Sequence, residues 1–308
     1  MSEIMKDLNA TLKSSDTEET IDIYFTRPIG YRWALFFNKF DVHPNVVTIL
    51  SIILGVAAGI CFYYTDFWHN LAGVLLLMWA NFYDSCDGQL ARMTGKKTLW
   101  GRMLDGFAGD IWFFTIYLAI VARLWNQNIP FTDINWGWGF FLFACFNGFI
   151  LHARQSALAD YYRNIHLFFL KGKSGSELDN FAQQRKLFNE LSWKGNFWWK
   201  VFVYFYGNYT RGQERQTPQF QRFFKKLKEV YGEDIPQEFR DRFRAQSKPL
   251  MPFTNILTFN TRAIALYISC LINMPYLYVF FEAIVLTSLY IYMRNRHENM
   301  CRKFYEEL

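Results

Sequence analysis

Residues 84–92 read DSCDGQLAR, and this acidic stretch is followed by Gly101 and Asp105 in a strongly apolar part of the chain. Asp84 and Asp87 are three residues apart, so on a helix they share one face. A second helix that starts near Gly101 brings Asp105 back to the level of these two carboxylates. Acidic groups at lipid depth are costly unless they hold cations, and hard divalent ions prefer oxygen ligands. The stretch therefore predicts metal chemistry on two consecutive helices of a membrane protein.

Small residues and one cation accompany these carboxylates. Gly88 and Ala91 fall on or beside the same stripe of the helix, so a bulky ligand or a second helix can approach the backbone closely. Arg92 lies five residues beyond Asp87, nearer the helix end. The pattern predicts a helix face that binds a large ligand next to the metals.

Residues 84–105 resemble the signature of the CDP-alcohol phosphotransferase family, which reads D-x2-D-G-x2-A-R-x8-G-x3-D-x3-D. The last position differs, because Gly109 stands where the family has its fourth aspartate and Asp110 comes one residue later. Upstream, residues 43–48 read HPNVVT and resemble the P-N-x-x-T segment that opens the first membrane helix of these enzymes. The resemblance covers roughly the first half of the chain and the last two apolar stretches, but not the middle.

The resemblance implies a transferase that uses two divalent ions, Mg²⁺ or Mn²⁺, to bind a CDP-linked substrate and release CMP. It also implies a homodimer. By the motif, the metal ligands are expected to be Asp84, Asp87 and Asp105, joined by Asp110. The CDP site is expected to comprise Asn45, Thr48, Asp84, Gly88, Ala91, Arg92 and Gly101. In the family, the fourth aspartate is the candidate base that deprotonates the attacking hydroxyl.

The sequence therefore raises the question of the catalytic base, for which we expect Asp110, with Asp105 as the second catalytic carboxylate. In a regular helix Gly109 shares a face with Asp105, whereas Asp110 is rotated by a further ~100°. Gly106 and Gly109 flank this turn, and glycine tolerates the wider turn of a π-bulge, which would bring Asp110 back into register. The alternative is that Asp110 caps or pairs elsewhere and that water or another carboxylate takes the proton.

The composition independently indicates a polytopic membrane protein of the all-α class. Hydrophobic residues make up 52% and aromatics 20%, yet the mean hydropathy is only -0.03, so apolar spans alternate with polar segments. About 20 apolar residues cross a bilayer core. The apolar run 263–293 would be about 46 Å long as one helix, too long for a single span, so we break it at 273–275. Six transmembrane helices are predicted, at residues 46–65, 70–90, 103–124, 134–151, 253–273 and 275–294.

The distribution of basic residues predicts the orientation. Three loops between these spans, 66–69, 125–136 and 273–275, contain no Lys or Arg, and of the 33 basic residues only Arg123 lies near that side. The positive-inside rule places the basic loops and both termini in the cytoplasm. The acidic motif is therefore expected to face the cytoplasm, where nucleotide-activated substrates are made.

The N-terminal segment, 1–45, is expected to be cytoplasmic and interfacial, without a cleavable signal peptide. Pro28 can begin a helix on which apolar side chains recur at helical spacing. These side chains are Ile29, Trp33, Phe36, Phe37 and Phe40. We predict that this helix lies on the membrane surface. Packing of its apolar stripe on the middle of the chain is equally compatible with the pattern.

The middle of the chain, 156–251, is rich in Lys, Arg and aromatic residues and is predicted to be a cytoplasmic helical insertion. Helices are expected at 175–193, opened by a capping box of Ser174 and Glu177, and at 218–231. A basic, aromatic surface beside a bilayer suggests contact with anionic lipid headgroups. No nucleic-acid-binding signature accompanies it. Before the insertion come the N-terminal segment, 1–45, and the first four spans with the motif, 46–155. After it come the last two spans and the tail, 252–308.

The acceptor of the reaction is less determined. Arg154 and Arg163 lie in a run that loosely resembles the acceptor-binding helix of phosphatidylinositol-phosphate and phosphatidylglycerol-phosphate synthases, although nine residues do not place them on one helix face. They favour transfer from CDP-diacylglycerol to a phosphorylated polyol, such as inositol phosphate. The alternatives are transfer from CDP-ethanolamine or CDP-choline to diacylglycerol or ceramide, and a non-catalytic CDP-lipid-binding protein, which Gly109 supports. Glu282, at membrane depth, is either a further site residue or an interhelical contact.

Overall fold

The computed structural model describes residues 14–96, 98–172, 176 and 178–308. All regular elements in these ranges are helical, and one isolated β-bridge joins Asn128 to Asn135. In chain order the elements are η1 Asp22–Thr26, α2 Arg27–Lys39, α3 Pro44–Cys61, α4 Phe67–Thr94, α5 Leu99–Leu124, α6 Gly137–Phe146, η2 Asn147–His152, α7 Ala153–Lys171, α8 Phe181–Glu190, α9 Phe197–Gln216, α10 Pro218–Tyr231, α11 Gln237–Ser247, η4 Lys248–Leu250, α12 Met251–Ile256, α13 Phe259–Leu271, α14 Tyr276–Phe281, η5 Glu282–Leu286 and α15 Thr287–Glu307. The segments η1, η2 and η5 are π-helical, and η4 is a 3₁₀-helix.

The chain divides into two compact units. The first comprises Met1–Leu151 and Asn260–Ala283, and the second comprises His152–Phe259 and Ile284–Leu308. The acidic motif lies in the first unit, and the basic, aromatic middle segment, 156–251, lies in the second.

Three helices of the described residues are long and apolar enough to cross a membrane, namely Pro44–Cys61, Leu104–Leu124 and Tyr276–Glu307. On α3 the distribution of side chains is the reverse of a soluble helix. Its exposed face carries Val46, Ile49 and Ile53, whereas its buried face is mostly small or hydroxylic. Such a helix presents its bulky apolar side to lipid and its small side to neighbouring helices.

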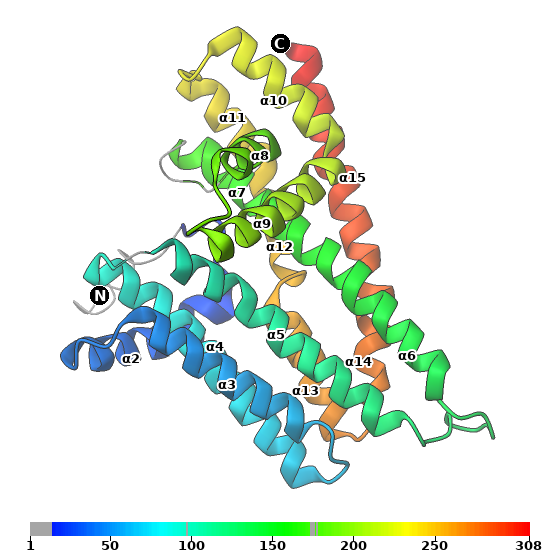
Figure 1. Ribbon diagram of the computed structural model, residues 1–308. Helices are drawn as coiled ribbons and strands as arrows, with labels where there is room; N and C mark the ends of the chain where they lie inside the picture. The colour runs from blue at the N-terminus through cyan, green and yellow to red at the C-terminus, as the bar shows by residue number, and fades with distance from the viewer. Residues whose placement is uncertain (1–13, 97, 173–175, 177) are drawn as a thin grey trace. The chain divides into compact units, whose positions relative to one another are not determined.

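Glycines on α3 allow α5 to pack closely against it, as the adjacent ribbons in Figure 1 illustrate. A Cβ atom at Gly55 would overlap the indole ring of Trp112, and one at Gly59 would lie 2.7 Å from Thr115 Cγ2. The pair forms a G-x-x-x-G pattern, which brings helix backbones together where the hydrophobic effect cannot. This packing fixes the register of α5, and therefore the height of Asp105.

Arg123, near the C-terminal end of α5, links this end to the neighbouring helices by hydrogen bonds. Its guanidinium is buried and donates hydrogen bonds to the Phe62 carbonyl at 2.9 Å, to Asn70 Oδ1 at 2.9 Å and to Asn273 Oδ1 at 2.5 Å. The basic residue nearest this end of the predicted spans is thus held inside the unit by three hydrogen bonds.

The second unit has an aromatic core. The rings of Phe169 and Phe243 stack with centroids 3.8 Å apart, and Phe223 stacks on Phe243 at 5.6 Å. Phe304, from the C-terminal part of α15, is 1% exposed and packs on the same rings. The last helix therefore continues into this core, where it packs against α10.

Several sequence predictions of element bounds are confirmed and others are wrong. The break at 273–275 occurs, with Asn273 at φ 60, and the helix predicted at 218–231 is α10. The predicted span 253–273 is not one helix, because α12 ends at Ile256 and α13 begins at Phe259. The helix that carries the predicted span 275–294 continues to Glu307, where its C-terminal part packs in the aromatic core.

The helix predicted at 175–193 is shorter in the structure. It is α8, and it begins at Phe181 because the side chain of Asn180 caps it by accepting a hydrogen bond from Gln183 N at 2.9 Å. The proposed capping box of Ser174 and Glu177 lies outside the described residues. The helix predicted from Pro28 is present as α2, and its packing partner is α4 of its own unit.

Candidate metal and nucleotide site

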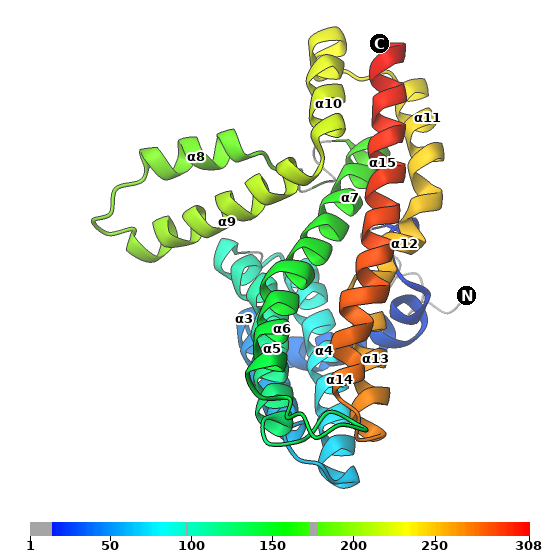
Figure 2. The ribbon, with the colours of Figure 1, turned by 90° about the vertical axis from the view of Figure 1, so that its right-hand side faces the viewer.

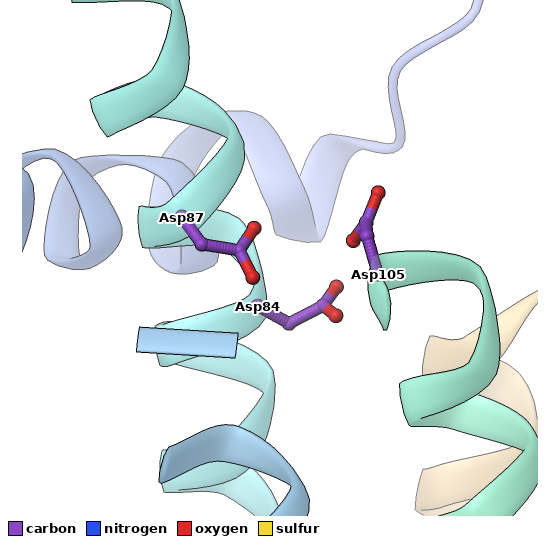
Figure 3. Close-up of side chains that lie close together, drawn as sticks. All are labelled: Asp84, Asp87 and Asp105. Carbon is purple, nitrogen blue, oxygen red and sulfur yellow. The ribbon is translucent and has the colours of Figure 1, made fainter. Parts of the chain in front are cut away.

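Three carboxylates converge from two helices of the first unit (Figure 3). Asp84 and Asp87 belong to α4 and Asp105 belongs to α5. Each offers one oxygen, and these oxygens all lie within 4.8 Å of one another. The i, i+3 spacing and the short α4–α5 turn produce this meeting, as the sequence predicts. Like charges at this distance repel one another, so a bound cation would stabilise the group.

The turn between the two helices is set by local signals. Gly95 ends α4 with a positive φ of 70, a conformation that glycine adopts without steric cost. Thr98 then caps α5 by accepting a hydrogen bond from the backbone N–H of Gly101 at 2.9 Å. These two ends reverse the chain within a few residues and bring the motif halves together.

Thr48 on α3 holds one of the carboxylates in place. Its hydroxyl donates a hydrogen bond to Asp87 Oδ2 at 2.5 Å, and both residues are buried. A donor of this kind orients a carboxylate and leaves its second oxygen for another partner. Thr48 therefore acts through Asp87, and it does so from the segment expected to belong to the CDP site.

Arg92 is folded back over its own helix. The guanidinium lies over Gly88, where a Cβ atom would be only 3.3 Å from Arg92 Nη1. Its Nε and Nη2 atoms are buried and have no hydrogen-bond partner among the described residues. It is also close enough to Asp87 and Asp105 for their charges to interact with it. A buried guanidinium with unused donors is suited to bind a phosphate group.

Asn45 and Gly101 meet at the same end of the helices. A Cβ atom at Gly101 would lie 2.8 Å from Asn45 Oδ1, so a side chain at this position would displace the Asn45 amide. Ala91 is half-buried on α4, one residue before Arg92. The residues expected at the CDP site therefore lie on the first turn of α3, the last turns of α4 and the start of α5.

The N-terminal segment closes on the motif helix from another side. A Cβ atom at Gly30 of α2 would lie 2.9 Å from Ser85 Oγ. Gln89, which is fully buried between motif residues, donates from Nε2 to the Arg27 carbonyl at 3.2 Å. The Arg27 guanidinium pairs with Glu18 at 3.2 Å and contributes positive charge near Asp84. No sequence motif marks this contact, so it was not predicted.

The predicted π-bulge at Asp110 is absent, and this expectation is wrong. Helix α5 is α-helical from Leu99 to Leu124, and a Cβ atom at Gly106 or Gly109 would meet nothing within 4 Å. The two glycines therefore impose no distortion. Asp110 is exposed and is not one of the three clustered carboxylates. Around a regular helix it is rotated by ~140° from Asp105.

The two arginines proposed for the acceptor lie on α7 of the second unit. Arg154 is exposed, whereas Arg163 is half-buried and donates from Nη2 to Asn255 Oδ1 at 3.2 Å. Arg163 Nε is buried and has no hydrogen-bond partner among the described residues. As the spacing predicts, the two side chains have different surroundings.

A second polar cluster in the first unit explains Glu282. This carboxylate is fully buried, forms an ion pair with Arg262 and accepts a hydrogen bond from the Tyr117 hydroxyl. Asn147 donates to the Tyr117 oxygen at 2.7 Å and to the Val279 carbonyl at 3.2 Å. Of the two readings of Glu282, the structure supports the interhelical contact.

Sequence reasoning missed Arg262 as the partner, although a signal was present. Arg262 lies 11 residues before the turn at Asn273, and Glu282 lies 9 residues after it. Opposite charges at matching distances from a helical turn reach the same depth.

Known proteins resemble part of this chain. The family model for CDP-alcohol phosphatidyltransferase matches residues 41–169, which include every motif residue of α3, α4 and α5. An uncharacterized protein of Aquifex aeolicus is 39% identical over 70 residues, which cover 23% of this chain and 34% of that protein. The archaetidylinositol phosphate synthase of Pyrococcus horikoshii is 39% identical over 64 residues, covering 21% and 32%.

A third relative is the bifunctional IPC transferase and DIPP synthase of Archaeoglobus fulgidus, 28% identical over 125 residues, which cover 39% of this chain and 24% of that protein. The chain thus spans about a quarter to a third of the length of the curated relatives it matches. No solved structure matches it. The match identifies residues 41–169 as a CDP-alcohol phosphatidyltransferase domain, a member of a family of transferases for phosphate-containing groups.

Proposed function

We propose, from the premise that residues 41–169 form a CDP-alcohol phosphatidyltransferase domain, that the chain synthesises a phospholipid. The reaction is transfer of the phosphatidyl group of CDP-diacylglycerol to a polar alcohol, with release of CMP. The observation that carries this proposal is the convergence of Asp84, Asp87 and Asp105 within 4.8 Å beside a buried guanidinium. A cluster of carboxylates suits divalent cations, and the guanidinium suits a phosphate.

The donor set fits a divalent metal, because all three side chains are carboxylates and Thr48 leaves one Asp87 oxygen for another partner. Divalent cations bound there would neutralise the charge that develops on the oxygen joining CMP to the phosphatidyl group. Asp84, Asp87 and Asp105 are the proposed ligands. Arg92 binds a phosphate oxygen of the donor, and Gly88 and Gly101 let Arg92 and Asn45 lie close to the backbone at the nucleotide site.

The acceptor hydroxyl oxygen attacks the phosphatidyl phosphorus, and the bond from that phosphorus to the CMP oxygen breaks. The hydroxyl proton passes to a carboxylate. We assign this role to Asp105, which lies in the cluster, rather than to Asp110, which points to another side of α5. Near-normal turnover of Asp110→Asn supports this assignment, and a loss as large as that of Asp105→Asn contradicts it.

The acceptor is proposed to be a phosphorylated polyol such as inositol phosphate. Arg154 and Arg163 support this proposal, and so do the names of two relatives, which concern an inositol phosphate lipid and an IPC transferase. If one arginine binds the acceptor phosphate, its change to Ala lowers kcat/KM for the acceptor. The reduction corresponds to a loss of about 2 to 4 kcal/mol of transition-state stabilisation. Donor binding then stays unchanged.

The membrane arrangement is also a proposal. Six spans place the acidic motif on the cytoplasmic side, with α2 on the membrane surface and the motif facing CDP-linked substrates. The exposed side chains of Phe36 and Phe40 support a lipid contact for α2. Labelling of single cysteines from either side of sealed vesicles tests the orientation.

One product assay tests the reaction. The purified chain in proteoliposomes receives CDP-diacylglycerol with inositol phosphate, or CDP-ethanolamine or CDP-choline with diacylglycerol or ceramide, and mass spectrometry identifies the lipid product. A phosphatidyl polyol phosphate with stoichiometric CMP is expected. A product only from the second pair of substrates would reverse donor and acceptor, and CDP-lipid binding without any product would make the chain a non-catalytic relative.

A further inference from the structure

The second unit carries a helical hairpin, α8 with α9, that projects from the other helices of its unit (Figure 2). None of the ten residues of α8 is buried. Six aromatic side chains of the hairpin are at least 39% exposed, and Trp198 reaches 69%. They are Trp193, Phe197, Trp198, Tyr204, Phe205 and Tyr209. Soluble proteins rarely expose so continuous an apolar surface without a partner.

The hairpin is nevertheless a built element. Helix α9 packs against α8 at Gly207, where a Cβ atom would make an ordinary contact of 3.5 Å with Gln184 Cβ. The backbone N–H of Phe181 donates to Glu214 Oε1 at 2.8 Å, and Gln213 Nε2 donates to the Ala157 carbonyl of α7 at 3.0 Å. These contacts use the inner side of α9. Of the exposed rings, Tyr209 also donates a hydrogen bond to Asp160 Oδ2 at 3.2 Å, whereas Trp198 and Phe205 remain 69% and 57% exposed.

The turn of the hairpin is fixed by one lysine. Lys200 Nζ donates to the Leu191 carbonyl at 2.7 Å, which satisfies the C-terminal end of α8. The same ammonium lies 4.6 Å from the ring centroid of Phe188 and 4.9 Å from that of Trp193. This cation–π contact holds the turn in shape while Trp193 and Trp198 remain 52% and 69% exposed.

The charge of the hairpin indicates its partner. Residues 180–216 contain six Lys and Arg against two Glu, and every basic side chain except Lys200 is exposed. A second copy of this surface would bring like charges together. An anionic phospholipid surface complements both the charge and the aromatic rings, because Trp and Tyr favour the interface and basic residues favour anionic headgroups.

We propose that the α8–α9 hairpin docks on an anionic phospholipid leaflet, with Trp193, Phe197 and Trp198 entering the headgroup region. Interfacial segments of this kind combine buried apolar area with attraction to acidic lipids, so the contact depends on lipid composition. The exposed lysine and arginine side chains contact phosphate groups, and the turn inserts its rings between them.

Hydrogen exchange of the full chain in nanodiscs tests the proposal. Discs of phosphatidylcholine alone are compared with discs that also contain phosphatidylglycerol, and exchange is followed by mass spectrometry. Residues 191–199 are expected to exchange roughly tenfold more slowly in the anionic discs. Helix α10 is the internal control, because it is also basic but buries its apolar side chains Phe220, Phe223 and Leu227. Its exchange stays the same.

A variant with Trp193→Ser and Trp198→Ser is expected to lose this protection. Trp68→Ser, in the first unit, is the matched control, because Trp68 is 74% exposed and lies outside the hairpin. Unchanged exchange at 207–216 shows that the double variant keeps the hairpin folded. If the variant does not fold, the comparison of the wild-type chain in the two lipid compositions still tests the proposal. Equal exchange in both lipid compositions overturns the proposal. So does protection that occurs only in discs holding two copies, which would identify a protein contact.

Discussion

Two clusters of ionisable side chains in the first unit are built in opposite ways. Asp84, Asp87 and Asp105 bring three groups of one sign together. Glu282 and Arg262 instead pair opposite charges, and the neutral side chains of Tyr117 and Asn147 hydrogen-bond around the carboxylate. One cluster carries surplus negative charge, whereas the other is balanced.

This difference separates a group that binds a ligand from a group that holds helices together. In the balanced cluster, Asn147 and Glu282 lie in the π-helical segments η2 and η5, whose wider turns form part of the helices that carry them. Arg262 neutralises the charge of Glu282 within the protein. In the acidic cluster Arg92 and Arg27 supply positive charge nearby and Thr48 provides one hydrogen bond but no charge, so a divalent cation would neutralise the three converging carboxylates.

The largest effect is expected from Asp87→Asn or Asp105→Asn. Either change removes a proposed metal ligand, so turnover is expected to fall by about 10³-fold or more. The change also removes a repelling charge, so the variants remain folded and their unfolding temperature in excess chelator does not decrease. Product formation and thermal unfolding in detergent measure the two effects.

Chelation of the wild-type chain is the companion experiment. Full activity in excess chelator, or normal turnover of either variant, would contradict the assignment of the three aspartates to metal binding. Recovery of wild-type activity by added Mg²⁺ or Mn²⁺ would identify the ion that the site uses.

The balanced cluster is expected to respond in stability rather than in metal dependence. Glu282→Gln leaves Arg262 buried without its counter-charge, which destabilises the chain by about 3 to 5 kcal/mol. Thermal unfolding measures the loss. A double variant with Glu282→Leu and Arg262→Met removes both charges and is expected to recover most of the stability. If the single and double variants lose the same stability, the pair does not act as a unit.

The sequence predicted the acidic cluster because its cause is local. Helical spacing within α4 and a short turn before α5 suffice to bring Asp84, Asp87 and Asp105 together. Helix α10 was predicted to its ends for the same reason, with Pro218 at its start and Gly232 after it. Signals carried by neighbouring residues survive in the tertiary structure.

The features that the sequence did not predict depend on distant partners. The G-x-x-x-G pair of Gly55 and Gly59 matters only because α5 presents Trp112 and Thr115. The expected π-bulge at Asp110 is absent, and no neighbouring group among the described residues contacts the adjacent glycines. The π-helical segment η5, by contrast, begins at Glu282, whose carboxylate pairs with the buried side chain of Arg262. A π-helical turn is thus decided by tertiary contacts, not by glycine content.

A smaller effect is expected from Thr48→Val, which removes the hydrogen bond that Thr48 donates to Asp87. The shape is retained and Asp87 loses its orientation, so metal affinity or activity is expected to fall by about 10- to 100-fold. Thr48→Ser is the matched control, because it keeps the hydroxyl. The apparent metal affinity, from activity against metal concentration, measures the effect. Equal losses in the two variants would show that packing, not the hydrogen bond, is the cause.

The smallest effect is expected from an ion pair at the surface. Water solvates these two charges, whereas the charges of the two clusters need partners within the protein or a bound ion. Lys96, in the turn between α4 and α5, donates a hydrogen bond to Asp41 at 2.5 Å, and Asp41 is 86% exposed. This hydrogen bond and the charge of the ammonium hold the pKa of Asp41 below its ordinary value. A carboxylate whose pKa is lowered on folding adds stability above its unfolded pKa and loses it as the pH falls through the folded pKa. The contribution is small because exposed pairs are screened by water and salt.

Lys96→Gln is therefore expected to lower the unfolding temperature slightly at neutral pH and low salt, and the difference from wild type is expected to vanish below about pH 4 or in high salt. Activity should be nearly unchanged. A difference that is independent of both pH and salt would assign the effect of Lys96 to packing of the turn rather than to its charge.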